Sequence, residues 1–283
     1  MKKRKRSWGK LLGQLALILC AVAALFPVLF MVTHSFFSGS EITESYGALS
    51  GSGEMRFHPI PDRATLESWA EVFLLSPSYL MKFWSSMLLA LGTVAGQVIV
   101  SAVSGYGFAK FRFPLRRVLY FTVVILMMMP VQVLMVSQYP VLQKLGLLGS
   151  YWALIIPGAF GAFGIFLITQ VYSYIPDELL EAAKIDGASH LQILLRIVVP
   201  CSKMGIASLV VLSFIDNWNL VEQPIVFLKN TWQYPLSVFL SQINESRLDV
   251  AFVCGVLAIL PTALLYLFMK DALVSGIENA SLK

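Results

Sequence analysis

Long windows without a charged residue are the feature that most constrains how this chain folds. A helix needs about 20 apolar residues to cross a hydrocarbon core of about 30 Å. Five windows without Asp, Glu, Lys or Arg reach that length, namely residues 11–40, 83–109, 118–143, 145–176 and 250–269. A sixth, residues 204–227, is interrupted only by Asp216 and Glu222. The windows lack the alternation of membrane barrel strands, so we expect an all-α membrane protein with six transmembrane helices.

The composition excludes several classes of protein. Hydrophobic residues make up 57% of the chain and charged residues 13%, whereas soluble domains carry about 25% charged residues. A soluble enzyme, a disordered tail and a nucleic-acid binder are therefore poor fits. No disulfide framework or metal spacing can be built from the three separated cysteines, Cys20, Cys201 and Cys254. No metal site is predicted from the isolated histidines, His34, His58 and His190.

The basic residues predict the orientation of the chain. Six crossings place both termini on one side of the membrane. Of the 21 Lys and Arg residues, 15 fall on that side, in segments 1–10, 108–117, 174–203 and 270–283. Cytoplasmic loops carry an excess of Lys and Arg, so both termini are expected to be cytoplasmic.

The first window permits a second interpretation. Basic residues from Lys2 to Arg6 are also how a signal peptide begins, and Ala21-Val22-Ala23 resembles a cleavage site. The apolar stretch continues to Val32, which is long enough to span a bilayer. We therefore expect a retained anchor.

Two of the connecting segments carry further signals. Leu66, Trp69, Ala70 and Phe73 recur at helical spacing after Thr65, a plausible cap, and predict a short amphipathic helix on the outer surface. That helix is either a lid over the bundle or a docking site for an external partner. The turn at residues 110–117 alternates aromatic and basic residues, but basic charges beside a bilayer are usually an orientation signal. Membrane lipid is thus an expected partner and nucleic acid is not.

The segment of residues 174–203 is longer than an ordinary connection. Pro176 followed by acidic residues fits a helix start, and Gly187 fits the left-handed position that ends that helix. Ser189 with Gln192 forms a capping-box pattern, which predicts a second helix. Another protein could pack closely against a low-profile face of small side chains, Ala182, Ala183 and Ala188.

This segment resembles the EAA loop of ATP-binding-cassette (ABC) import permeases. The likeness rests on Glu181-Ala182-Ala183, on Asp186-Gly187-Ala188, and on Ile197 followed by Val199-Pro200, with valine where leucine is commoner. The chain is also similar to carbohydrate importers of the maltose-permease type at residues 59–73, 105–114, 129–130, 218–219 and 274–276. The resemblance implies a type I ABC importer transmembrane domain at residues 83–275. An anchor and external loop at residues 1–82 would precede it, and a cytoplasmic tail at residues 276–283 would follow it.

The resemblance also implies partners in a bacterial cytoplasmic membrane. They are a second, different permease, an ATPase subunit dimer, an extracellular solute-binding protein and a sugar. Glu181, Ala182, Ala183, Asp186 and Gly187 would form the coupling helix seated in the ATPase. The chain has no Gly-x-x-x-x-Gly-Lys-Ser/Thr phosphate loop, so we expect a transport subunit without enzymatic activity and without its own cofactor. ATP and Mg would bind the partner ATPase.

Polar residues near the end of the interrupted window, residues 204–227, are candidates for the substrate pathway. Sugars bind through hydroxyl hydrogen bonds and an apolar ring face, which together favour Asn217, Trp218, Asn219 and Glu222. The alternative is that Asp216 and Glu222 pair internally or with the second permease, and that Trp218 is an interfacial anchor. The main function predicted is sugar import, and the alternative is import of another solute, such as glycerol phosphate or a polyamine. An intramembrane enzyme would need paired catalytic groups, which the sequence lacks.

Overall fold

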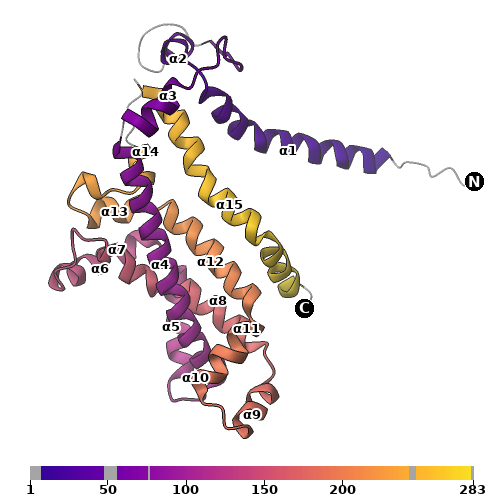
Figure 1. Ribbon diagram of the computed structural model, residues 1–283. Coiled ribbons are helices and arrows are strands. Elements are labelled where there is room, and N and C mark those ends of the chain that lie inside the picture. Colours follow the sequence, from indigo (N-terminus) through magenta and orange to yellow (C-terminus); the bar gives the residue numbers. More distant parts are fainter. Residues whose placement is uncertain (1–7, 48–55, 76, 242–246, 282–283) are drawn as a thin grey trace, which may run out of the picture. The chain divides into compact units, whose positions relative to one another are not determined.

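The computed structural model describes residues 8–47, 56–75, 77–241 and 247–281 (Figure 1). The described residues are mostly helical and contain no strand. They fall into two compact units, one made of residues 1–80 and 240–260 and the other of residues 81–239 and 261–283. The division into an anchor segment, a transmembrane domain and a tail stays a prediction, although helix α15 continues through most of the expected tail.

The helices run in the following order. The first half of the chain contains α1 (Trp8–His34), α2 (Gly39–Tyr46), α3 (Glu67–Ala70) with a π-helical turn (Glu71–Leu75), α4 (Pro77–Lys110), α5 (Arg116–Met128) and α6 (Val131–Lys144). The middle contains α7 (Trp152–Ala159), α8 (Ala162–Ser173), α9 (Asp177–Ile185), α10 (His190–Ile193) with a π-helical turn (Leu194–Val198), and α11 (Val199–Cys201). The last part contains α12 (Lys203–Trp218), α13 (Glu222–Phe227), a 3-10 turn (Thr231–Gln233), α14 (Leu236–Ser241) and α15 (Leu248–Ser281).

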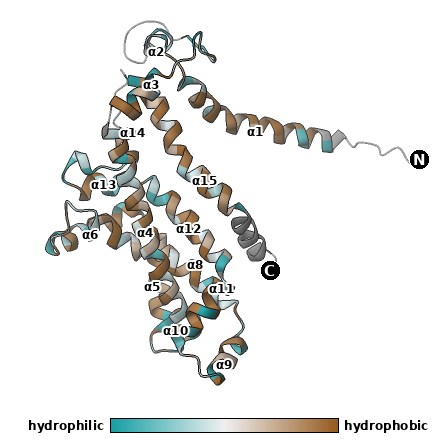
Figure 2. Ribbon diagram, in the orientation of Figure 1, coloured by the Kyte–Doolittle hydropathy of each residue, from teal (hydrophilic) through white to brown (hydrophobic). Residues whose placement is uncertain are grey.

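The apolar helices match the predicted crossings. Straight candidate spans cover residues 12–34, 78–110, 152–173 and 248–270, and two bent helix pairs raise the number to as many as six. Figure 2 shows apolar residues along most of α1, α4 and α15. The all-α membrane fold is therefore confirmed.

One predicted span is broken rather than continuous. The window of residues 118–143 forms α5 and α6, whose axes bend by 111° at Met129 and Pro130. Pro130 has no backbone N–H, and a residue that precedes proline is pushed towards extended geometry. Met129 accordingly adopts φ −73° and ψ 138° and ends α5. The predicted crossing is therefore one span only if the two helices of this bent pair are taken together.

Residues 30–46 and 248–252 enclose an aromatic core in the first unit. Phe37, Ile42 and Tyr46 are buried there. His34 is fully buried, lies 2.6 Å from the Tyr46 hydroxyl through Nε2, and stacks on Phe37 with ring centroids 4.4 Å apart. The sequence treats His34 as isolated, but the fold makes it part of this core.

The short external helix begins one residue later than predicted. Its N-cap is Leu66, which has no side chain to accept a hydrogen bond, while the Thr65 hydroxyl accepts from the Glu67 N–H at 3.4 Å. Ser68 and Val72 are the buried positions of this helix, whereas Leu66 is 65% exposed and Phe73 44% exposed. The predicted apolar face is therefore divided: Leu66 and Phe73 are exposed, whereas Trp69 and Ala70 are half-buried and the Trp69 ring stacks on Phe36 with centroids 5.8 Å apart.

Helix α4 packs closely against α7 and α8 in the second unit. A Cβ atom added at Gly105 would lie 2.8 Å from Cγ2 of Ile168, and one added at Gly158 would lie 2.4 Å from Cγ2 of Thr93. Small residues allow such close approach between membrane helices, where dispersion contacts replace the hydrophobic effect as the driving force. This packing fixes the end of α8, from which the loop of residues 174–203 departs.

Candidate functional site in the loop of residues 174–203

Helix α9 begins where the sequence predicts it. Pro176 is its N-cap, and Asp177 and Glu178 occupy its first turn, where the positive end of the helix dipole favours carboxylates. Lys110, at the end of α4, donates to Oδ1 of Asp177 at 2.7 Å and to the Ile175 carbonyl. The Lys110 side chain is only 7% exposed. The hydrogen bond from this ammonium, followed by its charge, holds the pKa of Asp177 below its ordinary value. Lys110 thus fastens the start of the loop to the transmembrane bundle.

The turn after α9 is a Schellman motif centred on Gly187. The Gly187 N–H donates to the Lys184 carbonyl at 3.0 Å, and the Ala188 N–H donates to the Ala183 carbonyl at 2.9 Å. Gly187 has φ +82°, in the left-handed region that glycine adopts without a steric penalty. The predicted role of Gly187 as a helix terminator is confirmed.

The second helix also starts as predicted. The Ser189 side chain accepts from the Gln192 N–H at 3.4 Å, and the Gln192 side chain accepts from the Ser189 N–H at 2.8 Å. This capping box leads into α10, a π-helical turn and α11. The chain then breaks at Ser202, whose hydroxyl donates to the Val198 carbonyl at 2.7 Å. The helices before and after Ser202 differ in direction by 79°.

Buried apolar side chains attach the loop to the bundle. Leu180 and Ala183 from α9 join Ile193, Leu194 and Val198 in one cluster. The same cluster contains transmembrane residues, Tyr106, Ile168, Tyr172 and Leu209. The low-profile face expected at Ala182, Ala183 and Ala188 is therefore not formed as a unit, because Ala183 points into this core and Ala188 packs against it. Ala182 remains exposed.

The end of α9 is the open part of the loop. Glu181, Asp186 and Gly187 are exposed, and a Cβ at Gly187 would meet no atom within 4 Å. Among the residues that the structure describes, none pairs with Glu181 by a hydrogen bond or a salt bridge. Figure 1 shows α9 at the far end of the second unit, beyond α5 and α10.

An exposed apolar residue that was not predicted lies at the same place. Ile185 is 87% exposed, and Leu191 on the following helix is 63% exposed. The available signal was helical geometry, since Ile185 lies about 140° around the helix from Leu180 at 3.6 residues per turn. The exposed end of α9 thus presents a carboxylate, an isoleucine and a glycine turn, while Lys110 and the buried apolar cluster attach the rest of the loop to the transmembrane bundle.

The predicted substrate residues do not share one environment. Trp218 is 4% exposed and packs against Phe83 and Phe214, with both ring-centroid distances 5.6 Å. The suggestion that Trp218 is an interfacial anchor does not agree with this burial. The amides of Asn217 and Asn219 donate to carbonyls one turn earlier in α12, at 2.7 Å and 2.9 Å.

Glu222 lies beyond the end of α12, and its carboxylate accepts from the Gln132 amide of α6 at 2.9 Å and 3.0 Å. This contact is internal, as the alternative interpretation of Glu222 allows. Asp216 is exposed and forms no ion pair with a described residue. A substrate pathway through these residues stays a prediction.

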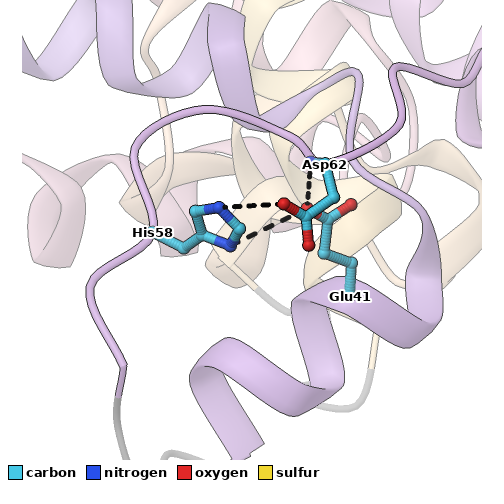
Figure 3. A group of neighbouring side chains, drawn as sticks. All are labelled: Glu41, His58 and Asp62. Atoms are coloured by element: carbon cyan, nitrogen blue, oxygen red, sulfur yellow. Dashed lines mark hydrogen bonds and ion pairs between the residues drawn. The ribbon is translucent and has the colours of Figure 1, made fainter.

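One cluster in the first unit has the donor types of a metal site. Glu41, His58 and Asp62 offer ligand atoms that lie within 4.8 Å of one another (Figure 3). The two ring nitrogens of His58 face different carboxylates, Nδ1 at 3.8 Å from Glu41 and Nε2 at 3.6 Å from Asp62. The Glu41 carboxylate also accepts from the Asp62 N–H at 2.7 Å. Both distances from the ring are longer than a hydrogen bond, so the group is a loose set of one imidazole and two carboxylates. The expectation that His58 is isolated was wrong.

Comparison with known proteins relates nearly the whole chain to membrane subunits of transport systems. Residues 97–279 match the family model of the binding-protein-dependent transport system inner membrane component. The sn-glycerol-3-phosphate transport system permease protein UgpE of Brucella abortus (strain 2308) is 27% identical over 96% of this chain and 97% of its own length. The arabinooligosaccharides transport system permease protein AraQ of Halalkalibacterium halodurans is 25% identical over 93% of this chain and 92% of its own length.

A solved structure supports the same fold. A chain of a bacterial ABC transporter involved in the import of the acidic polysaccharide alginate superposes with a TM-score of 0.82 at 22% identity. The alignment covers 96% of this chain and 98% of that chain. The chain described here is a multi-pass permease subunit of an ABC importer and not an enzyme, and its ATPase is a separate subunit. The match over residues 97–279 establishes that the protein belongs to the family of binding-protein-dependent transport system inner membrane components.

Proposed function

We propose that this permease translocates a sugar or oligosaccharide and that residues 174–203 couple its movement to the ATPase. One observation carries the coupling role. The loop is anchored at Lys110 and through the buried cluster of Leu180 and Ala183, yet it leaves Glu181, Asp186 and Gly187 exposed at its end. A rigid projection suits docking into a cleft of another subunit, since the Glu181 carboxylate has no partner among the described residues.

The assembly proposed here has the partners that the loop requires. A second permease completes the pathway, an ATPase dimer binds ATP and Mg, and an extracellular binding protein delivers the solute. The excess of Lys and Arg in the segments joined to both termini supports a cytoplasmic position for the termini and for the loop. Glu181 then faces a basic group of the ATPase, because a carboxylate buried in an interface needs such a partner.

Coupling in this arrangement depends on a difference between two states. The ATPase can drive the transition only if it binds the loop more favourably in one conformation of the permease than in the other. The movement is a rigid-body rotation of the spans. The bond from Lys110 and the buried apolar cluster transmit the displacement of α9 to the bundle, because they leave the loop little freedom to move alone.

The named relatives carry two kinds of solute. Relatives are named for arabinooligosaccharides and for sn-glycerol 3-phosphate. A phosphate substrate would favour Lys or Arg deep inside the spans, whereas the described basic residues of the straight candidate spans, Lys82, Lys110 and Lys270, lie within a few residues of a span end. Sugar import through Asn217, Trp218, Asn219 and Glu222 is therefore the first candidate. Import of sn-glycerol 3-phosphate is the second, because relatives with that name match 96% of the chain.

Charge reversal of Glu181 tests the coupling role. Glu181→Lys should abolish uptake and the stimulation of ATPase activity by the loaded binding protein, while membrane insertion stays normal. The control is Glu178→Lys, which makes the same change at another exposed position of α9. Normal transport by Glu181→Lys, or equal losses in both variants, would refute a specific role for Glu181.

Ligand competition tests the substrate. Uptake of a labelled sugar into proteoliposomes that contain the complete transporter should be unaffected by excess sn-glycerol 3-phosphate. Competition by that compound, with transport of its labelled form, would reject the sugar assignment and leave the coupling proposal intact.

A further inference from the structure

A cavity of about 680 Å³ lies beside the loop but belongs to a different part of the surface. Its walls come from the end of α4, the turn that follows it, the start of α5, and the end of α8. The residues that give it chemical character are Arg112, Arg116, Arg117, Tyr120, Gln170 and Ser173. Its described lining contains no Asp or Glu, so the cavity carries the charge of three guanidinium groups.

The ends of the candidate spans fix the depth of this cavity. The span in α4 ends at Lys110, the span through α8 ends at Ser173, and α5 begins at Arg116. The hydrocarbon region extends along these helices, so residues at their ends lie at the level of the lipid headgroups. The cavity therefore opens where lipid phosphates are located.

The guanidinium groups are available to an anion. In the part of the chain that the structure describes, Arg112, Arg116 and Arg117 form no ion pair. The Gln170 amide donates to the Tyr120 hydroxyl at 2.8 Å, which holds two polar side chains in the wall. Arginine binds phosphate oxygens through two parallel N–H bonds, and this geometry suits a phosphodiester. Helix α5 also starts here without a side-chain cap, which adds a smaller positive contribution.

The surface next to the cavity is apolar. Helix α5 has no buried residue, and its first two turns expose Val118 (59%), Leu119 (48%) and Phe121 (63%). A free phosphate would use the arginines and leave these side chains without a role. A phospholipid would use both, with its headgroup in the cavity and its acyl chains along α5.

We propose that this cavity is a binding site for the headgroup of an anionic phospholipid. Basic pockets between transmembrane helices on the cytoplasmic side recognise such headgroups. The site adjoins Ser173, four residues before Asp177, so a bound lipid would also stabilise the end of α8 from which the loop departs. This role goes beyond transport and does not depend on the identity of the solute.

The test compares lipid retention by the complete transporter. The complex is reconstituted in nanodiscs of phosphatidylcholine with or without phosphatidylglycerol, and retained lipid and thermal stability are measured after purification. We expect the unmodified complex to retain phosphatidylglycerol and to gain thermal stability from it, because a ligand that binds the folded state stabilises it. Removing two arginines should weaken retention by about 30-fold, since each basic residue near an anionic lipid contributes about one kcal/mol and about 1.4 kcal/mol is tenfold.

The variant is the double change Arg116→Gln with Arg117→Gln, and the control is Arg63→Gln, an exposed arginine of the external segment. The comparison of the two lipids in the unmodified complex keeps the test valid if the double variant folds poorly. Equal retention of both lipids by the unmodified complex would overturn the proposal. Displacement of the lipid by millimolar inorganic phosphate would also overturn it, because the site would then recognise a free anion. Crosslinks from residues 116 and 117 to a partner subunit in place of lipid would assign the cavity to an interface and reject it.

Discussion

The left-handed conformation of Gly187 allows a graded test of the coupling loop. A Cβ at this position would meet no atom within 4 Å, so a substitution acts through the backbone and not through a clash. A residue other than glycine in the left-handed region costs about 1–2 kcal/mol, and Asn tolerates it better than most residues. We expect the free loop of such a variant to relieve this strain by opening the turn at residue 187. Docking on the ATPase requires the strained turn again, so the strain energy weakens binding by the same amount. A difference of 1–2 kcal/mol corresponds to a factor of about 5–30 in an equilibrium constant.

The assay is the dissociation constant of the ATPase subunits for the permease pair. Gly187→Ala should raise it by about 5- to 30-fold, Gly187→Val should raise it further because a β-branched side chain is worse at positive φ, and Gly187→Asn should have the smallest effect. Insertion and the thermal stability of the transmembrane helices should change little in all three. If Asn weakens binding as much as Val, the side chain at this position matters rather than φ. If no variant weakens binding, Gly187 is not part of the docking surface.

Three further predictions follow from contacts in the second unit. Gly105→Ala should destabilise the protein by about 1–3 kcal/mol in a thermal unfolding assay, because the added Cβ would approach Ile168 to 2.8 Å. The control is Gly107→Ala on the same helix, where an added Cβ would meet no atom within 4 Å and should not destabilise the protein. Equal melting temperatures of the two variants would contradict the close packing of α4 on α8. Trp218→Ala should cost about 3–5 kcal/mol and lower the melting temperature, whereas Asn219→Ala should leave it unchanged; a change only in substrate affinity for Trp218→Ala would instead place that ring in the pathway. Lys110 lowers the pKa of Asp177, so the bond between them stabilises the fold fully above the ordinary pKa of 3.8 and loses this effect as the pH falls through the lowered pKa. Asp177→Asn should therefore be less stable than the unmodified protein at pH 7, by under about 1 kcal/mol for so exposed a carboxylate, and as stable as that protein at low pH. A stability difference that persists in acid would exclude this bond as its source.

The sequence predicts the loop well because its signals are local. Pro176, Gly187 and the pair Ser189 and Gln192 each determine the geometry of residues within a few positions along the chain. The hydrogen bonds that they form join residues at most five positions apart. Capping and turn chemistry therefore predict helix, turn and helix before any tertiary contact is known.

The contacts that hold the loop in place are not local, and the sequence analysis did not find them. Lys110 and Asp177 are 67 residues apart, and the apolar windows give no sign of which residues face one another. The burial of Trp218 and the inward direction of Ala183 depend on such neighbours. The break at Pro130 was different, because the proline was visible and its effect on the preceding residue is a general rule.

The 79° bend at Ser202 determines what kind of displacement can reach the fifth span. The bend joins the helical segment His190–Cys201 to α12. When that segment shifts along its own axis, the component of the shift along the axis of α12 is the cosine of 79°, about a fifth. The component perpendicular to that axis, the sine of the bend, is nearly the whole shift. A push from the loop therefore acts on α12 as a sideways swing and not as a piston stroke, which is the direction needed to widen or narrow a gap between neighbouring helices.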